Sequence, residues 1–125
     1  MNKLIFLTLL LIFFSCKEDN SNSSPDDLLQ QMESIDEEIE ALLITQCSDG
    51  SQCVATPIGV KPCGGPTRFI VHSDATDQAK LDALIEEYNE LNAKYNEMNN
   101  LGSDCSVVTA PEMDCISGTC QAVEN

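Results

Sequence analysis

The chain has 125 residues, which is room for one small domain, and it carries six Lys and Arg against 21 Asp and Glu, for a net charge of −15. A surface this acidic repels nucleic acid and anionic lipid head groups, so we expect no nucleic-acid partner. Two interpretations of the charge stay open. The acids form solvated helix faces, or they favour a protein or cationic partner.

The first fifteen residues predict a secretory signal peptide. Lys3 supplies its basic start, and the apolar run over residues 4–14 is interrupted only by Thr8. A run of about eleven residues is too short to span a bilayer. Without these fifteen residues the chain keeps five Lys and Arg against 21 Asp and Glu, so its net charge becomes −16.

Cys16 follows this signal directly and stands apart from the other cysteines. The segment around it resembles a bacterial lipoprotein signal, in which the cysteine becomes the lipidated N-terminus after cleavage. The next residues, Lys17, Glu18 and Asp19, resemble the Cys-Lys-acidic-acidic export signal of Bacteroidota surface lipoproteins. The resemblance implies acyl chains such as palmitate on Cys16 and a cell-surface position on the outer membrane, with residues 16–24 as a flexible tether.

The first expected element is an amphipathic helix that begins at Pro25 and ends near Thr45. Ser24 is suited to cap it, proline fits the first helical position, and two acids sit at the positive end of the helix dipole. Apolar residues spaced by three and four then form one stripe: Leu28, Met32, Ile35, Ile39 and Leu42.

Residues 46–66 form a block that concentrates Cys, Gly and Pro. A turn is expected at residues 48–51 and a short strand at residues 52–56. Pro57 and Pro62 exclude a regular central strand beyond that point, because proline has no N–H for a sheet ladder.

The block closes in a tight turn at residues 63–66, where two glycines suit positive φ. Residues 67–73 follow as the best strand in the chain, because they are rich in β-branched and aromatic side chains.

A second amphipathic helix is expected from about Thr76, capped by Asp74 or by Thr76 itself. Its apolar stripe is again spaced by three and four residues: Leu81, Leu84, Tyr88, Leu91, Tyr95 and Met98. Gly102 is expected to take the left-handed position after its last turn.

Short strands are expected near residues 106–109, 114–116 and 119–123, with Ser117 and Gly118 as a two-residue hairpin loop. The sequence therefore predicts a small disulfide-stabilised α+β domain over residues 25–125, in which two amphipathic helices pack with a short antiparallel sheet.

Six cysteines in an exported domain predict three disulfides: Cys47, Cys53, Cys63, Cys105, Cys115 and Cys120. Zinc is disfavoured, because the chain has no Cys-x-x-Cys and one histidine. Facing residues of antiparallel strands have a constant numerical sum, which suggests a nested set: 63 with 105, 53 with 115 and 47 with 120. Local pairing is the competing arrangement, with Cys47–Cys53 and Cys115–Cys120.

Few residues suggest chemistry, and we expect neither an enzyme nor a cofactor. His72 has no nucleophile or metal signature near it and fits a structural role at a strand end. Asp49 and Ser51, with Ser103 and Asp104, flank cysteines and offer a weak calcium site whose spacing does not match an EF-hand loop.

Residues 55–61 are expected to form an exposed, rigid contact loop between cysteines, with Val60 and Lys61 as anchors. Its candidate contact residues are Thr56, Pro57, Ile58, Gly59, Val60 and Lys61. The Lys-Pro-Cys-Gly-Gly-Pro core and the Ser-Asp-Cys and Gly-Thr-Cys motifs of the tail resemble a family of uncharacterised bacterial secreted proteins, which implies a shared fold and no activity. We expect a non-enzymatic surface binding or structural module; the alternative is a protease inhibitor that acts through this loop.

Overall fold

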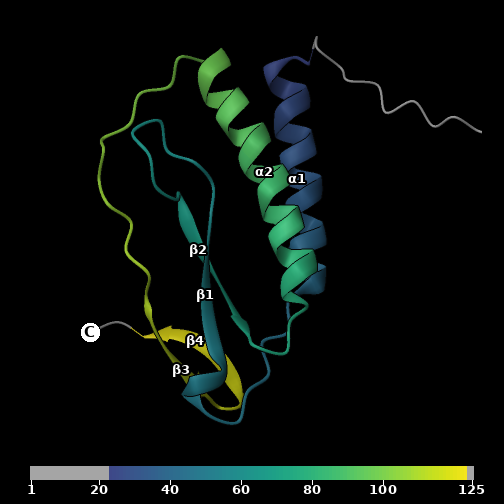
Figure 1. The fold of residues 1–125 in the computed structure, drawn as a ribbon, viewed down its shortest axis with the longest axis vertical. Helices are drawn as coiled ribbons and strands as arrows, with labels where there is room; N and C mark the ends of the chain where they lie inside the picture. The colour runs from purple at the N-terminus through teal and green to yellow at the C-terminus, as the bar shows by residue number, and fades with distance from the viewer. Residues whose placement is uncertain (1–22, 124–125) are drawn as a thin grey trace, which may run out of the picture.

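The computed structural model describes residues 23–123 (Figure 1). The expected signal peptide, Cys16 and the export residues Lys17, Glu18 and Asp19 lie outside the described residues. The described chain forms two helices and two small antiparallel sheets, which confirms the α+β class. The elements are α1 (Pro25–Leu42), a 3-10 turn η1 (Gly50–Gln52), β1 (Cys53–Ile58), β2 (Arg68–Ser73), α2 (Gln78–Met98), β3 (Glu112–Ile116) and β4 (Thr119–Val123).

Helix α1 begins where the sequence predicts. The Ser24 hydroxyl accepts a hydrogen bond from the Asp27 amide at 3.2 Å, and the Asp27 carboxylate accepts one from the Ser24 amide at 2.9 Å. This reciprocal capping box satisfies N–H groups that have no partner inside the helix. The helix ends at Leu42, three residues before the expected end, because Leu43 is already extended.

Helix α2 is capped at both ends by residues other than those expected. Asp77, rather than Asp74 or Thr76, caps it by accepting from the Lys80 amide at 3.1 Å. The Thr76 hydroxyl instead accepts a hydrogen bond from the Ile44 amide at 3.0 Å and so ties the helix start to the chain after α1. At the other end Asn100, with φ 47°, takes the left-handed position expected of Gly102.

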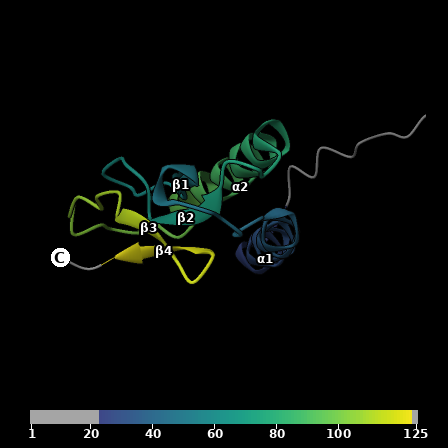
Figure 2. The same cartoon turned by 90° about the horizontal axis from the view of Figure 1, so that it is seen from below.

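Strands β1 and β2 form a two-stranded antiparallel sheet that packs on both helices (Figure 2). The apolar core lies between the sheet and the helix pair, and its buried members come from all four elements: Ile35, Ile39, Ile58, Ile70, Leu81 and Ile85. Ile85 is buried in this core although it is absent from the predicted stripe of α2. The expected stripe residues Leu84, Tyr88 and Leu91 are half-buried against this core.

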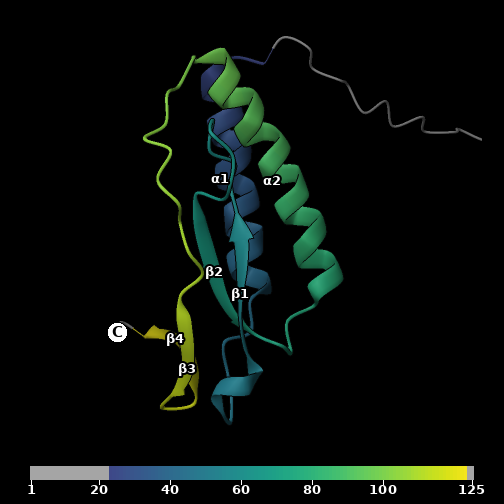
Figure 3. The ribbon, with the colours of Figure 1, turned by 60° about the vertical axis from the view of Figure 1, so that its left-hand side comes forward.

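Strands β3 and β4 form a hairpin at the Cys53 end of the first sheet (Figure 3). Ser117 and Gly118 make its two-residue loop with φ of 54° and 78°, which matches the positive φ that the favoured hairpin turn requires. This confirms the predicted hairpin. The prediction of a strand near residues 106–109 is wrong, because residues 99–111 run back along the molecule without strand pairing (Figure 1).

Three disulfides cross-link the domain, and one expected pair, Cys63–Cys105, is confirmed. The other two bonds are Cys47–Cys115 and Cys53–Cys120. Both the nested pairing of these four cysteines and the local pairing are therefore wrong. The bonds do join the central block to the C-terminal block, but they exchange the two partners that nesting assigns.

The path of residues 44–53 explains this exchange. The Cys47 amide donates to the Gly118 carbonyl at 3.1 Å and the Cys120 amide donates to the Thr45 carbonyl at 2.8 Å, so the chain before Cys47 pairs with the start of β4. Turn η1 then reverses the chain before Cys53. Facing residues have a constant numerical sum only within one antiparallel ladder, and this reversal interrupts the ladder. The sum therefore does not predict the partners of Cys47 and Cys53.

No helix within residues 23–123 is long and apolar enough to cross a membrane.

Candidate binding groove

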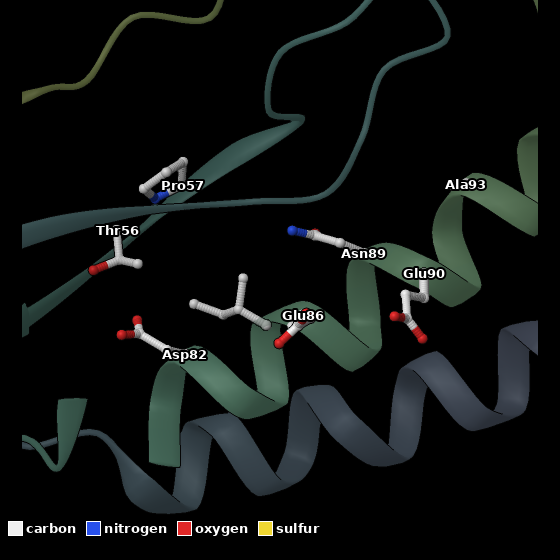
Figure 4. A pocket seen from close by; sticks show the side chains of 8 residues that line it. Thr56, Pro57, Asp82, Glu86, Asn89, Glu90 and Ala93 are labelled. Atoms are coloured by element: carbon white, nitrogen blue, oxygen red, sulfur yellow. The ribbon is translucent and has the colours of Figure 1, made fainter. Parts of the chain in front are cut away.

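An open groove of about 650 Å³ runs between the outer edge of β1 and helix α2 (Figure 4). It is lined by two residues of β1 and by one face of α2: Thr56, Pro57, Asp82, Ile85, Glu86, Asn89, Glu90 and Ala93. Pro57, Ile85 and Ala93 give it apolar walls, and the carboxylates lie along the helix. The groove is present and open to solvent in this structure.

A second hollow of about 400 Å³ continues the groove toward the end of α2. Ala93 lines both, so the two hollows adjoin along the helix. The far part is lined by Lys61, Pro62 and Leu101 among others, and Leu101 is 44% exposed.

Three asparagines of α2 fix the backbone that leaves β1. The side-chain oxygen of Asn89 accepts a hydrogen bond from the backbone N–H of Gly59, and that of Asn92 accepts one from the backbone N–H of Val60, each at 2.7 Å. The side-chain NH₂ of Asn96 donates to the Val60 carbonyl at 2.7 Å. These bonds set the width of the groove, because they hold the chain at a fixed distance from the helix. Sequence reasoning missed them, although amide side chains at spacings of three and four within a helix are a usable signal.

Residues 55–61 do not form the exposed loop that the sequence suggests. Residues 55–58 belong to β1, and Ile58 and Gly59 are buried. The Lys61 ammonium donates to the Ser106 carbonyl at 2.7 Å and the Ser106 hydroxyl at 2.9 Å, and the side chain is only 15% exposed. The expected anchor therefore holds residues 104–106 in place. Thr56 and Pro57 line the groove, and Val60 and Lys61 line its continuation.

The two parts of the expected calcium site lie beside cysteines of different disulfides. Asp49 precedes η1 between Cys47 and Cys53, and the Ser51 hydroxyl and amide donate to its carboxylate and lower its pKa. Asp104 adjoins Cys105, and its pKa is lowered mainly by the Ser106 amide, then by the Ser106 hydroxyl and the Lys61 ammonium. Each carboxylate thus has local partners of its own.

His72 is fully buried in the sheet. Its Nδ1 lies 2.9 Å from the Ser73 carbonyl, and since a carbonyl only accepts, Nδ1 carries the proton. Its Nε2 lies 2.8 Å from the Thr56 hydroxyl. Both ring nitrogens are engaged, which fits the structural role expected from the sequence.

Among residues 23–123, the group whose ligand atoms lie as close together as a metal site requires is Cys47, Cys53 and Cys120. All three sulfurs are already in disulfide bonds. They offer no thiolate, the form of cysteine that binds metals.

No family model, no curated protein and no solved structure matches the chain.

Proposed function

We propose that the protein is a lipid-anchored module on the outer surface of the outer membrane, and that it acts by binding a partner rather than by catalysis. The groove between β1 and α2 carries this proposal. It is open and already formed, and the scaffold beneath it is cross-linked by three disulfides. Such pre-organisation lowers the ordering entropy that a binding site loses when its partner docks.

The anchor belongs to the same proposal and depends on Cys16 and on the Lys17, Glu18 and Asp19 signal. Residues 16–24 would tether the domain at a short distance from the lipid. The first residue of α1 lies close behind this tether, so the folded domain would begin almost at the membrane surface.

A non-catalytic role is supported by the state of the one histidine. His72 is buried and hydrogen-bonded at both ring nitrogens, so it is not placed to exchange protons with a bound substrate. The groove itself presents carboxylates and amides but, in its described lining, no cysteine or serine nucleophile.

The alternative of a protease inhibitor loses its support in this geometry. An inhibitory loop has to enter a protease cleft, whereas Ile58 is buried in the core and Lys61 is bound to Ser106. We expect no inhibition in a panel of extracellular proteases.

Site-specific photo-crosslinking on intact cells tests the binding role. A photoreactive amino acid replaces Ala93, which lines both parts of the groove, and a control protein carries it at Glu33 on the exposed face of α1. We expect a discrete crosslinked species from position 93 and none from position 33. Identical products from the two positions, or none from either, would contradict a binding function of the groove.

Cell fractionation tests the anchor. Cys16→Ala should move the protein out of the membrane fraction, and replacement of Lys17, Glu18 and Asp19 by Ala should leave it in the membrane but protected from protease added to whole cells. Unchanged membrane association of Cys16→Ala would refute lipidation, and unchanged protease sensitivity of the triple variant would refute the export signal.

A further inference from the structure

The helix layer and the sheet layer of this domain differ in width. Each helix is about 10 Å across, so α1 and α2 together span about 20 Å, whereas the two strands of the sheet lie only about 4.8 Å apart. Strand β1 packs beside α2, and the groove lies between the outer edge of this strand and the helix. The outer face of α2 therefore lacks the strand that would cover it.

The hydrogen bonds of the sheet show which groups point to this edge. The Asp74 amide donates to the Gln52 carbonyl at 2.8 Å, and the Ser73 amide is directed away from β1 to the Ile44 carbonyl at 2.6 Å. Because ladder partners alternate along antiparallel strands, the even-numbered residues of β1 pair with β2. The N–H and C=O of Ala55 and the C=O of Pro57 are therefore directed outward.

The position of Pro57 fits this assignment. A proline is tolerated where its missing N–H would have faced away from the neighbouring strand, and Pro57 is at an outward position opposite Phe69. The β1–β2 ladder is thus intact, and the outer edge keeps one donor and two acceptors at Ala55 and Pro57.

The charge along the groove selects the occupant. Asp82, Glu86 and Glu90 follow one another at intervals of four residues on α2 and all line the groove (Figure 4). Asp82 accepts from Gln78 at 2.7 Å, but within residues 23–123 no hydrogen bond or ion pair engages Glu86 or Glu90. Like charges at this spacing repel one another, and a cationic ligand would relieve that repulsion.

We propose that the groove binds an extended peptide segment carrying lysine or arginine at alternate positions, which adds to β1 as a third strand. This proposal rests on the binding function above and names its partner. Main-chain bonds to Ala55 and Pro57 hold the segment, and its basic side chains meet Asp82, Glu86 and Glu90. A second copy of this chain is a poor occupant, because two molecules of net charge −15 repel each other.

The spacing of the two elements supports alternate basic positions. Residues four apart on a helix are separated by about 6 Å along its axis, and residues two apart on a strand by about 6.7 Å. The axial rise between successive carboxylates of α2 is thus close to the rise between alternate residues of the incoming strand, while the carboxylate row turns by about 40° around the helix at each step. Three adjacent basic residues would place the middle one on the opposite face.

Peptide binding to the full-length protein in neutral detergent micelles tests the proposal. The probe is fluorescently labelled acetyl-Thr-Lys-Val-Lys-Val-Lys-Thr-amide, and its control has the same composition in the order Thr-Val-Lys-Lys-Lys-Val-Thr. Fluorescence anisotropy should give saturable binding of the alternating peptide and at least about 5-fold weaker binding of the control, since each exposed ion pair contributes up to about 1 kcal/mol.

Two further comparisons separate docking in the groove from general attraction. Glu86→Gln with Glu90→Gln should weaken binding about 5-fold, and Glu33→Gln with Glu37→Gln, the same charge change on the exposed face of α1, by less than about 2-fold. N-methylation of the amides on one edge of the peptide should weaken binding about 10-fold, and methylation of the other edge should have little effect.

Absence of saturable binding, equal affinity for the two peptides, equal weakening by the two double variants, or equal effects of methylation on both edges would overturn the proposal. A crosslink from position 93 on cells together with any of these results would mean that the groove binds a partner of another chemistry. Absence of both the crosslink and peptide binding would contradict the binding function itself.

Discussion

The two ends of the domain are held together by different forces. In the part formed by α1, α2, β1 and β2, six buried aliphatic side chains make a continuous core. In the β3–β4 hairpin the one buried residue is Cys120, and every other residue of the two strands is half-buried or exposed. Two disulfides join this hairpin to the chain around β1. The first part is a hydrophobic core, and the second is a covalent attachment to it.

This difference explains how a domain of about one hundred residues supports a peripheral hairpin. An isolated two-stranded hairpin is at best marginally stable in water. Here two disulfides, Cys47–Cys115 and Cys53–Cys120, replace the apolar contacts that the hairpin lacks. The hydrogen bond from the Cys120 amide to the Thr45 carbonyl adds to them. The groove lies on the hydrophobic part and does not include the hairpin.

The largest expected effect comes from the core. Leu81 has no exposed surface, and Leu81→Ala should lower the free energy of unfolding by about 2–5 kcal/mol through lost burial and a cavity. Urea unfolding monitored by circular dichroism measures this loss. The matched hairpin variant, Ile116→Ala, should cost under about 0.5 kcal/mol because Ile116 is 40% exposed. Comparable losses at both sites would break the distinction between the two parts.

Removal of a hairpin disulfide should rank next. Cys53→Ser with Cys120→Ser should lower the free energy of unfolding by about 2–4 kcal/mol, because the bond closes a long loop in the unfolded chain. The helical circular dichroism signal should persist at room temperature, while amide hydrogen exchange in β3 and β4 accelerates. Loss of the helical signal would show that the core depends on the hairpin.

A smaller effect is expected at the asparagine contacts beside the groove. Asn96→Ala removes the donor to the Val60 carbonyl and should cost about 0.5–1.5 kcal/mol. Asn99→Ala is the control, because Asn99 bonds only within its own helix, to Tyr95. Hydrogen exchange at Gly59 and Val60 should increase in the first variant alone, and an equal increase in both would contradict a role in fixing the groove.

The smallest expected effect is the loss of folding stability at acid pH. Hydrogen bonds lower the pKa of Asp27, Asp49 and Asp104 in the folded state, so the unfolded chain binds more protons at low pH. The contribution of these carboxylates to the free energy of unfolding is fully present above their unfolded pKa of about 3.9, and it falls as the pH drops below that value. Urea unfolding between about pH 2 and 5 should show this slope. Ser106→Ala should flatten it slightly, and a steeper slope in that variant would contradict the assignment at Asp104.

Local signals predicted much of the fold because local physics decides those features. Ser24 and Pro25 mark the start of α1, the two glycines after Cys63 make the predicted turn at φ of 92° and 85°, and Ser117 with Gly118 makes the hairpin loop. Each depends on the conformational preference of one or two residues, which no distant contact overrides here.

Features that depend on distant contacts escaped prediction. The partners of Cys47 and Cys53 depend on the reversal at η1 and on the pairing of residue 46 with Thr119, neither of which has a signal in the cysteine spacing. The groove was missed because its walls come from β1 and α2, twenty and more residues apart in the chain. Lys61 was expected to be exposed because its bond to Ser106 joins residues 45 positions apart.

Disulfide mapping of the non-reduced protein tests the covalent attachment of the hairpin most directly. After free thiols are blocked, cleavage before Asp49 separates Cys47 from Cys53, and thermolysin cleavage before Ile116 separates Cys115 from Cys120. Mass spectrometry should then find Cys47 joined to Cys115 and Cys53 joined to Cys120. A peptide that joins Cys115 to Cys120, or Cys47 to Cys53, would show that the hairpin is not covalently held to the core and would contradict this structure of the domain.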